Sequence, residues 1–263
     1  MEEGILQRRQ FRLDQRAVIF ASCSAPIYYT SPLTFHPKLW YRCLVLENTE
    51  QLALPFIEAA RNDTPVDPEA PSSITREAIN ELPIRSYQGQ IILVTSDDEL
   101  APAIEEIRKE TLLGFDTETK PVFRAGVSHP PALVQLAGES CAWIFQLRNL
   151  KNLNLLYNLF ANARILKAGV ALADDLKKLK ELHEFKPAAF TEVGYLARKL
   201  GYTQTGLRTL AGLVLGFRVS KREQRSNWAR TQLTPSQITY AATDAWVSRA
   251  LYLELTRRLE ARG

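Results

Sequence analysis

Two acidic side chains, Asp116 and Glu118, stand at the end of an apolar run in TLLGFDTETKP, residues 111–121. Side chains of a β-strand alternate between the two faces of a sheet, so both carboxylates point to one face while Phe115 and Thr117 point to the other. Two carboxylates in a partly buried space repel each other unless a positive charge lies between them or one takes up a proton. A divalent cation meets that need. An isolated Asp-x-Glu pair is also common at solvated strand ends, so further ligands must come from elsewhere.

Two later segments carry acids that could complete such a site. Asp174 and Asp175 open an expected helix in LADDLKKL, directly after the expected strand RILKAGV. The helix dipole alone also favours acids at this position, so the pair has a purely structural interpretation as well. In TYAATDAW, Tyr240 and Asp244 are four residues apart and share one face of an expected helix, among small and apolar residues. An unpaired carboxylate there is unfavourable, so the spacing directs a phenol and a carboxylate at one point.

The elements that must position these side chains begin at about residue 74. Strands are predicted over QIILVT (90–95), TLLGFDTET (111–119), PALVQLAG (131–138), CAWIFQL (141–147) and RILKAGV (164–170). Helices are predicted over 96–110, 149–162, 172–184, 191–201, 206–216 and 234–261, and a short helix capped by Ser73 or Thr75 is predicted within 72–83. A three-stranded antiparallel meander, a parallel crossover strand and flanking helices indicate a mixed α/β sheet.

The first part of the chain differs from the rest. Residues 1–73 show little periodicity and end in RNDTPVDPEAPSS, a composition typical of a linker. We therefore expect an N-terminal extension over 1–73 and one folded domain over 74–263. Residues 1–84 carry a net charge of −3, whereas residues 85–263 carry +7. A basic domain is a mild indication of a polyanionic partner, although a solvated basic face is as common.

Composition excludes several classes of protein. The 263 residues are 46% hydrophobic and 24% charged, as in ordinary globular domains. No apolar run approaches the roughly 20 residues that span a membrane, and no secretory signal is predicted. The three cysteines and three histidines lack the spacing of a zinc site or a disulfide framework. We expect a cytoplasmic protein that does not bind membranes.

Three stretches together resemble those of a known enzyme family: FDTET, GVALADDLKKL and SNWARTQLTPSQITYAATDAW. They are similar to the three motifs of the DEDDy 3′-to-5′ exonucleases, whose members include ribonuclease D and the proofreading domain of DNA polymerase I. The third stretch is the most specific and most resembles the exonuclease domain of the Werner syndrome helicase. The resemblance covers about residues 85–258 and implies a ribonuclease H-like fold.

The resemblance implies five catalytic residues, which are Asp116, Glu118, Asp175, Tyr240 and Asp244. In the second motif the family spacing selects Asp175, and its neighbour Asp174 stands where relatives often have a small residue. The family also implies that Tyr240 orients the attacking water and that nucleoside 5′-monophosphates are released. Carboxylate ligands without histidine or thiolate suit Mg²⁺ or Mn²⁺, and four carboxylates can hold two such ions roughly 3.5–4 Å apart.

A basic loop precedes the third motif and provides candidates for substrate contact. The loop FRVSKREQRSNWAR, residues 217–230, contributes Lys221, Arg222, Arg225 and Trp228. Basic groups beside a metal site can bind a phosphate backbone, although a solvated loop has the same composition. Trp228 is also a candidate packing residue, which competes with a role in base stacking.

A second group of candidates follows the first motif. Thr119 and Lys120, and beyond them Phe123 and Arg124, stand where relatives contact the terminal nucleotide. This chain departs from the Werner-type pattern of an acid followed by Trp at this point. The shape of the pocket for the terminal base therefore stays open.

The sequence thus predicts a metal-dependent 3′-to-5′ exonuclease whose partner is nucleic acid with a free 3′ end, with DNA favoured. One alternative is ribonuclease D-like trimming of RNA; we expect it less, because the given sequence stops at Gly263 without the C-terminal helical RNA-binding domains typical of that branch. Another is a non-catalytic nucleic-acid-binding module, which usually loses one or more of the acids. The choice between DNA and RNA depends on contacts to the 2′-hydroxyl, which no motif reports, and the oligomeric state also stays open.

Overall fold

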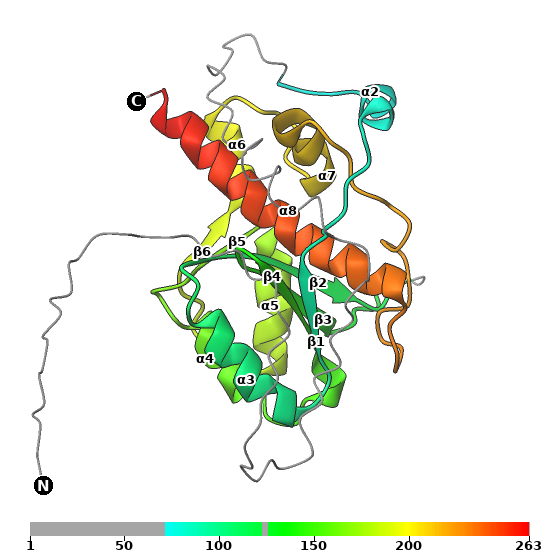
Figure 1. Cartoon of the computed structure of the whole chain (residues 1–263), viewed down its shortest axis with the longest axis vertical. Helices are drawn as coiled ribbons and strands as arrows, with labels where there is room; N and C mark the ends of the chain where they lie inside the picture. The colour runs from blue at the N-terminus through cyan, green and yellow to red at the C-terminus, as the bar shows by residue number, and fades with distance from the viewer. Residues whose placement is uncertain (1–71, 123–125, 263) are drawn as a thin grey trace, which may run out of the picture. The chain divides into compact units, whose positions relative to one another are not determined.

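A computed structural model of the chain describes residues 72–122 and 126–262, so most of the predicted N-terminal extension lies outside the described residues. Six strands form one mixed sheet in the order β1–β4–β3–β2–β5–β6 (Figure 1). The strands are β1 Gln90–Val94, β2 Leu112–Thr119, β3 Pro131–Ala137, β4 Cys141–Gln146, β5 Leu166–Gly169 and β6 Phe190–Glu192. Strands β2, β3 and β4 form the predicted antiparallel meander, and β5 pairs parallel to β2. Strand β1 pairs parallel to β4, and β6 pairs parallel to β5.

Helices cover both faces of this sheet. They are α2 Arg76–Glu81, α3 Asp97–Ile107, α4 Asn154–Phe160, α5 Leu172–Leu182, α6 Val193–Lys199, α7 Leu207–Leu210 and α8 Pro235–Glu260. A short 3-10 turn, Leu147–Asn149, precedes α4, and a π-helical segment, Ala211–Leu215, continues α7. In Figure 1 the long helix α8 crosses the sheet, with α6 and α7 beside its C-terminal half. Within the described residues, no helix is both long and apolar enough to cross a lipid bilayer.

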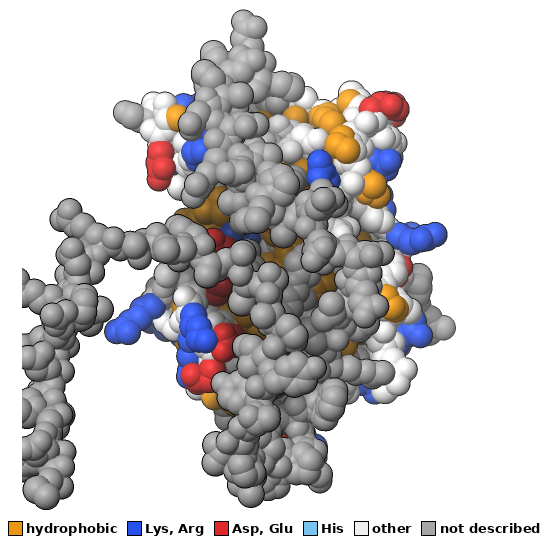
Figure 2. All heavy atoms as spheres, viewed as in Figure 1, with side chains coloured by type: hydrophobic (Ala, Val, Ile, Leu, Met, Phe, Trp, Pro, Cys, Tyr) orange, Lys and Arg blue, Asp and Glu red, His pale blue; other side chains and the backbone are white. Residues whose placement is uncertain are grey.

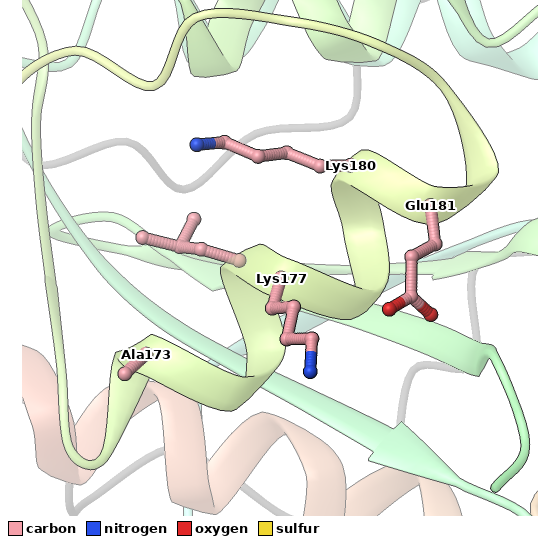
Figure 3. Close-up of a pocket in the computed structure, with 5 residues that line it drawn as sticks. Ala173, Lys177, Lys180 and Glu181 are labelled. Carbon is pink, nitrogen blue, oxygen red and sulfur yellow. The ribbon is translucent and has the colours of Figure 1, made fainter.

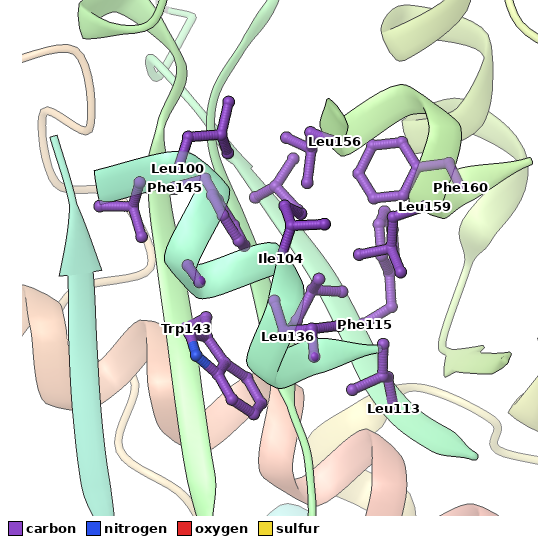
Figure 4. Close-up of a cluster of buried hydrophobic side chains, with 14 of the residues drawn as sticks. Leu100, Ile104, Leu113, Phe115, Leu136, Trp143, Phe145, Leu156, Leu159 and Phe160 are labelled. Atoms are coloured by element: carbon purple, nitrogen blue, oxygen red, sulfur yellow. The ribbon is translucent and has the colours of Figure 1, made fainter. Parts of the chain in front are cut away.

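Alternate residues of the strands separate two hydrophobic clusters. Trp143 and Phe145 of β4 pack with α3, α4 and α5, whereas Ala142 and Ile144 pack with α8. The first cluster is built from large aliphatic and aromatic side chains that interdigitate between β2, β4, α3 and α4 (Figure 4). Because side chains of a strand alternate between faces, α8 and the group α3, α4 and α5 lie on opposite faces of the sheet.

Helix α8 approaches β2 closely because small residues line the contact. A Cβ atom at Gly114 would lie 1.8 Å from the carbonyl oxygen of Ala245, so only glycine fits there. The start of the helix is also fixed, since Thr234 and Gln237 form a capping box and Pro235 occupies the first turn. The position and the register of α8 relative to β2 are therefore both set by sequence.

Three predicted helices differ from those observed. The helix predicted over 149–162 begins only at Asn154, because the backbone N–H groups of Lys151 and Asn152 donate to Asp97 Oδ1 of α3 at 2.9 and 3.3 Å. The helix predicted over 191–201 starts at Val193, since the residues before it pair with β5 as strand β6. The helix predicted over 206–216 changes from α to π geometry at Ala211.

Candidate active site

Three carboxylates from two elements meet in one place. Asp116 and Glu118 project from the α8 face of β2, and Asp244 comes from the N-terminal half of α8. Each offers one oxygen, and these oxygens all lie within 4.8 Å of one another. The pairing of β2 with β3 shifts register between Glu118 and Thr119, an irregularity that is frequent next to active sites. Asp244 is 6% exposed, and its Oδ1 atom has no hydrogen-bond partner.

Asp175 lies outside this group of three but is held close to it. The Thr117 hydroxyl donates to Asp175 Oδ1 at 2.5 Å, which ties the start of α5 to β2. The neighbouring Asp174 is exposed, whereas Asp175 is half-buried. Burial raises the pKa of Asp175 to about 6, and the Thr117 hydrogen bond opposes this effect. The structure thus directs Asp175, and not Asp174, toward the predicted site.

A residue that the sequence did not indicate fixes the beginning of α5. The carboxylate of Glu192, at the end of β6, accepts hydrogen bonds from the backbone N–H groups of Ala171 at 3.1 Å and Leu172 at 2.9 Å. Ala171 adopts a left-handed conformation with φ of 61°, so the chain turns sharply between β5 and α5. Glu192 therefore caps the helix that carries Asp175.

Burial and mutual repulsion make the ionised forms of these acids unfavourable without a cation. Burial, and then repulsion from Asp244, Glu118 and Asp175, raise the pKa of the Asp116 carboxyl well above its usual value. Burial, followed by repulsion from Asp244 and Asp175, raises the pKa of Glu118 to about 9. Such shifts are typical of carboxylates that share one small site. The cluster consequently favours either protonation or a bound cation.

Tyr240 stands one turn before Asp244 on α8 and is 8% exposed. Burial raises the pKa of Asp244 to about 7, while a hydrogen bond with Tyr240 and the charge of Arg208 lower it. Burial, and then repulsion from Asp244 and Glu118, raise the pKa of Tyr240 above its usual value. The ring of Trp228 lies 5.7 Å from that of Tyr240 at an interplanar angle of 41°. The Tyr240 phenol is thus protonated at neutral pH. The indole of Trp228 packs against the ring of Tyr240.

Arg208 is a second residue that sequence reasoning missed. It lies on the short helix α7, and its Nη2 donates to the carbonyl oxygen of Val219 at 2.7 Å. Its Nε and Nη1 atoms are buried without hydrogen-bond partners, and its charge interacts favourably with that of Asp244. A cation in the otherwise apolar stretch LRTLAGLVL was a usable sequence signal, but it required knowledge of where α7 packs.

The predicted substrate-binding residues fall into three groups. Lys120, Lys221, Arg222 and Arg225 are exposed, and Thr119 is half-buried at the end of β2. Phe123 and Arg124 lie outside the described residues. Trp228 is 1% exposed and belongs to the α8 cluster, so it supports Tyr240 and does not present a face for base stacking. Of the two roles that the sequence left open for Trp228, its burial favours packing.

A pocket of about 230 Å³ opens beside Tyr240 and Asp244. Arg85, Ser220 and Glu223 contribute to its walls, so the basic loop borders the candidate site. Glu223 accepts a hydrogen bond of 2.7 Å from the Ser236 hydroxyl, which fastens this loop to the first turn of α8. On the part of the face that is visible in Figure 2, the Lys and Arg side chains of the described residues lie at several separate places.

A larger hollow of about 510 Å³ lies along α5. Figure 3 shows Lys177, Lys180 and Glu181 extending from this one helix, with Ala173 at its start. Among the described residues, no second element contributes a side chain to its lining. The hollow therefore lacks the convergence of groups from different elements that an active site requires.

Comparison with known proteins agrees with this geometry. Residues 91–260 match the model of a 3′-5′ exonuclease family. The chain is 31% identical over 209 residues to the exonuclease 3′-5′ domain-containing protein 2 of Mus musculus, a match that covers 73% of this chain and 32% of that protein. It is 30% identical over 186 residues to the bifunctional 3′-5′ exonuclease/ATP-dependent helicase WRN of Mus musculus, covering 67% of this chain and 13% of that protein. These matches thus span a third or less of either relative.

Solved structures share the fold. The Nibbler EXO domain of Aedes aegypti superposes with a TM-score of 0.61 at 22% identity, over 67% of this chain and 93% of that one. Ribonuclease D of Escherichia coli superposes with a TM-score of 0.59 at 24% identity, over 64% of this chain and 45% of that one. The predicted ribonuclease H-like mixed sheet is therefore confirmed.

The matched family is a class of nucleases, and the three carboxylates on β2 and α8 form a group that could hold a metal ion. The chain belongs to the 3′-5′ exonuclease family, whose members are hydrolases that act on nucleic acid.

Proposed function

We propose that the chain removes nucleotides from the 3′ end of nucleic acid with the help of two divalent ions, Mg²⁺ or Mn²⁺. The proposed ligands are Asp116, Glu118, Asp175 and Asp244. The observation that carries this proposal is the convergence of three carboxylate oxygens within 4.8 Å of one another, from β2 and α8. When bound, the ions would neutralise these acids, lower the pKa of a water ligand and stabilise the leaving 3′-oxygen.

The donor set of this chain fits such ions. The four acids supply only carboxylate oxygens, which are the ligands that Mg²⁺ and Mn²⁺ prefer. Asp244 Oδ1 is buried without a hydrogen-bond partner, so one donor atom is available for a cation. Thr117 and Glu192 restrain Asp175 through the hydrogen bonds described above. This restraint reduces the conformational entropy that Asp175 would lose when it binds a cation.

Tyr240 would orient the attacking water and not accept its proton. The phenol is kept protonated, because burial and the neighbouring carboxylates raise its pKa. A protonated hydroxyl can donate one hydrogen bond and accept another, which suffices to hold a water molecule in line with a phosphodiester. Trp228 packs behind the ring and limits its rotation. Products would be nucleoside 5′-monophosphates.

Side chains of the basic loop and of the end of β2 would bind the polymer. Lys221, Arg222 and Arg225 would contact phosphates of the incoming strand, while Thr119 and Lys120 would lie near the terminal nucleotide. Ribonuclease D of Gluconacetobacter diazotrophicus is 30% identical over 175 residues, covering 65% of this chain and 44% of that protein. This similarity keeps trimming of RNA as a second candidate beside the favoured DNA substrate.

The test is degradation of 5′-labelled single-stranded DNA, partial duplex and RNA of matched sequence, each with Mg²⁺, with Mn²⁺ and with EDTA. We expect a ladder that shortens from the 3′ end with either metal and is abolished by EDTA. The preferred polymer is the one that shortens fastest. Absence of degradation in all lanes, with the protein folded and metal supplied, would instead support a non-catalytic nucleic-acid-binding module.

A further inference from the structure

We propose that Gln135 is a positioning residue for Asp116, holding that carboxylate in the orientation in which it binds metal. The inference rests on the proposed function of the acidic cluster and adds to it a residue outside the family motifs. Gln135 lies in the middle of β3, which is otherwise apolar from Pro131 to Ala137, and it is fully buried. Neither Oε1 nor Nε2 of its amide has a hydrogen-bond partner in the described structure.

The strand register places this amide next to Asp116. Gln135 pairs directly with Asp116 across the antiparallel β2–β3 ladder. Directly paired residues project to the same face of a sheet, with Cβ atoms about 4.5–5.5 Å apart. Leu133 and Ala137, two residues away on either side of Gln135, pack in the α8 cluster, which shows that Gln135 also faces α8. The amide and the carboxylate thus share the side of the sheet on which Asp244 lies.

Gln135 differs from the other two buried side-chain amides of the described residues, which are paired. Gln146 is 1% exposed, and its Nε2 donates to the carbonyl oxygens of Arg230 at 2.8 Å and Thr231 at 3.1 Å. Gln237 is 2% exposed, and its Nε2 donates to the carbonyl oxygen of Asn227 at 3.3 Å. A buried amide without partners destabilises a fold relative to a paired one. A leucine or methionine at 135 would avoid that loss, so glutamine needs a reason other than packing.

Asp116 provides that reason. Its carboxylate has two oxygens and stands among three other acids, whose repulsion favours alternative rotamers. A donor on the oxygen that does not face the cation would fix the rotamer, as outer hydrogen-bond partners of metal ligands generally do. The terminal torsion of a glutamine is soft, so Nε2 of Gln135 can turn to Asp116 without movement of the backbone. The neighbours of Gln135 on its own strand are apolar and offer no competing acceptor side chain.

The experiment replaces the amide by a thioether of nearly equal size. For wild type and Gln135→Met we would measure the thermal midpoint in EDTA and the affinity for Mn²⁺ by titration calorimetry at a temperature where both are folded. We expect the Mn²⁺ affinity to fall by about 10–100-fold, the usual effect of removing an outer partner. The metal-free midpoint should stay equal or rise, because an unpaired polar group has been removed.

Gln146→Met is the matched control, since it removes a buried amide that is already paired. Its metal-free midpoint should fall while its Mn²⁺ affinity stays unchanged. An unchanged Mn²⁺ affinity in Gln135→Met would overturn the proposal, whatever the thermal midpoint. Should that variant not fold, Gln135→Asn is measured in the same way, because it keeps the amide but withdraws it from Asp116 by one methylene. Wild-type protein that binds no Mn²⁺ would contradict the proposed metal-dependent function itself, so the two failures are distinguishable.

Discussion

The two faces of the sheet are built on different principles. The face covered by α3, α4 and α5 is filled with apolar and aromatic side chains (Figure 4). Among them, the rings of Phe115 and Phe160 pack edge to face with their centroids 5.8 Å apart. The face covered by α8 keeps Gln135 and Asp244 buried, each with at least one polar atom unpaired. Among the side chains of the first cluster, only the indole nitrogen of Trp143 is buried without a partner in the described residues.

The difference indicates that the face covered by α3, α4 and α5 mainly stabilises the fold, whereas the α8 face carries the groups of the candidate site. Burial of apolar area stabilises the fold, whereas buried unpaired polar groups destabilise it and persist at sites that must bind something. On the α8 face, the close contact of Gly114 with Ala245 holds Asp244 over β2. We therefore expect substitutions on the two faces to separate activity from stability.

The largest effect on activity is expected from Asp244→Asn on the α8 face. Loss of an outer hydrogen-bond partner of a metal site reduces activity by about 10–100-fold, so loss of a ligand should exceed that range. The metal-free thermal midpoint should not fall, because a buried carboxylate is replaced by a neutral amide. Nuclease rate and calorimetric melting of the same preparation measure both. Glu254→Gln on the same helix is the control, since Glu254 pairs with Arg257 and Arg258; comparable loss there would contradict the assignment.

Phe160→Ala, on the opposite face, is expected to lower stability and to leave activity unchanged. Phe160 is fully buried and contacts several aromatic rings, so the cavity should reduce the free energy of unfolding by about 3–5 kcal/mol. Activity per folded molecule at low temperature should be retained. Urea unfolding and a nuclease assay at the same temperature test this. Leu253→Ala, at a position 46% exposed on α8, should change stability by less than about 0.5 kcal/mol. A selective loss of activity in Phe160→Ala would break the separation between the faces.

The acids of the α8 face should make the stability of the metal-free protein depend on pH. The folded-state pKa values of Glu118 and Asp244 are raised to about 9 and about 7, above the unfolded values near 4. Groups of this kind favour the folded state at low pH, and that contribution is lost as pH rises through their folded pKa values. The thermal midpoint in EDTA should therefore fall between about pH 5 and pH 8. Lys167, whose pKa is lowered to about 8 by burial, stays protonated over most of that window and should add little slope.

The comparison that tests this pH dependence is between wild type and Asp244→Asn under identical buffers. The variant should show a flatter decline, because it has lost one titrating group and the repulsion that this group exerted on Glu118. A midpoint that rises with pH in the wild-type protein would show that the acids are not destabilised by burial. Saturating Mg²⁺ should reverse the wild-type trend, since cation binding competes with protons.

The sequence predicted the acidic side chains of the α8 face, but not the polar groups that surround them. The period of two in β2 and of four in α8 specified which carboxylates share a face, and the meander followed from alternation and turns. Neither pattern carries information on partners across the sheet, so neither indicated a role for Gln135. Arg208 was missed because its role depends on the packing of α7 against α8, which is a tertiary property.

The errors in secondary structure have the same physical origin. Strand β6 has three residues, too few for a periodic signal, and exists because it pairs with β5. The delayed start of α4 results from hydrogen bonds to Asp97, which is more than fifty residues away in sequence. In both cases tertiary contacts override local propensity. Local patterns therefore predicted the strands and helices that carry the acids, but not the tertiary contacts that position those elements.

The smallest effect is expected from the basic loop that borders the α8 face. Lys221 and Arg222 are exposed, so Lys221→Ala and Arg222→Ala should leave the thermal midpoint almost unchanged. Each should weaken nucleic-acid binding modestly and reduce the slope of log affinity against log salt by about 1 if it contacts one phosphate. Fluorescence anisotropy with labelled DNA and RNA at several salt concentrations measures the slope.

Lys109→Ala is the matched control for these loop variants, because Lys109 lies just after α3 and pairs with the exposed Glu106 at 2.7 Å. Its salt slope should equal that of wild type. Equal slopes in all three variants would show that the loop is merely solvated and would leave substrate contact to other residues. A reduced slope in the loop variants alone would extend the functional surface from the buried acids of α8 to the exposed loop fastened to its first turn by Glu223 and Ser236.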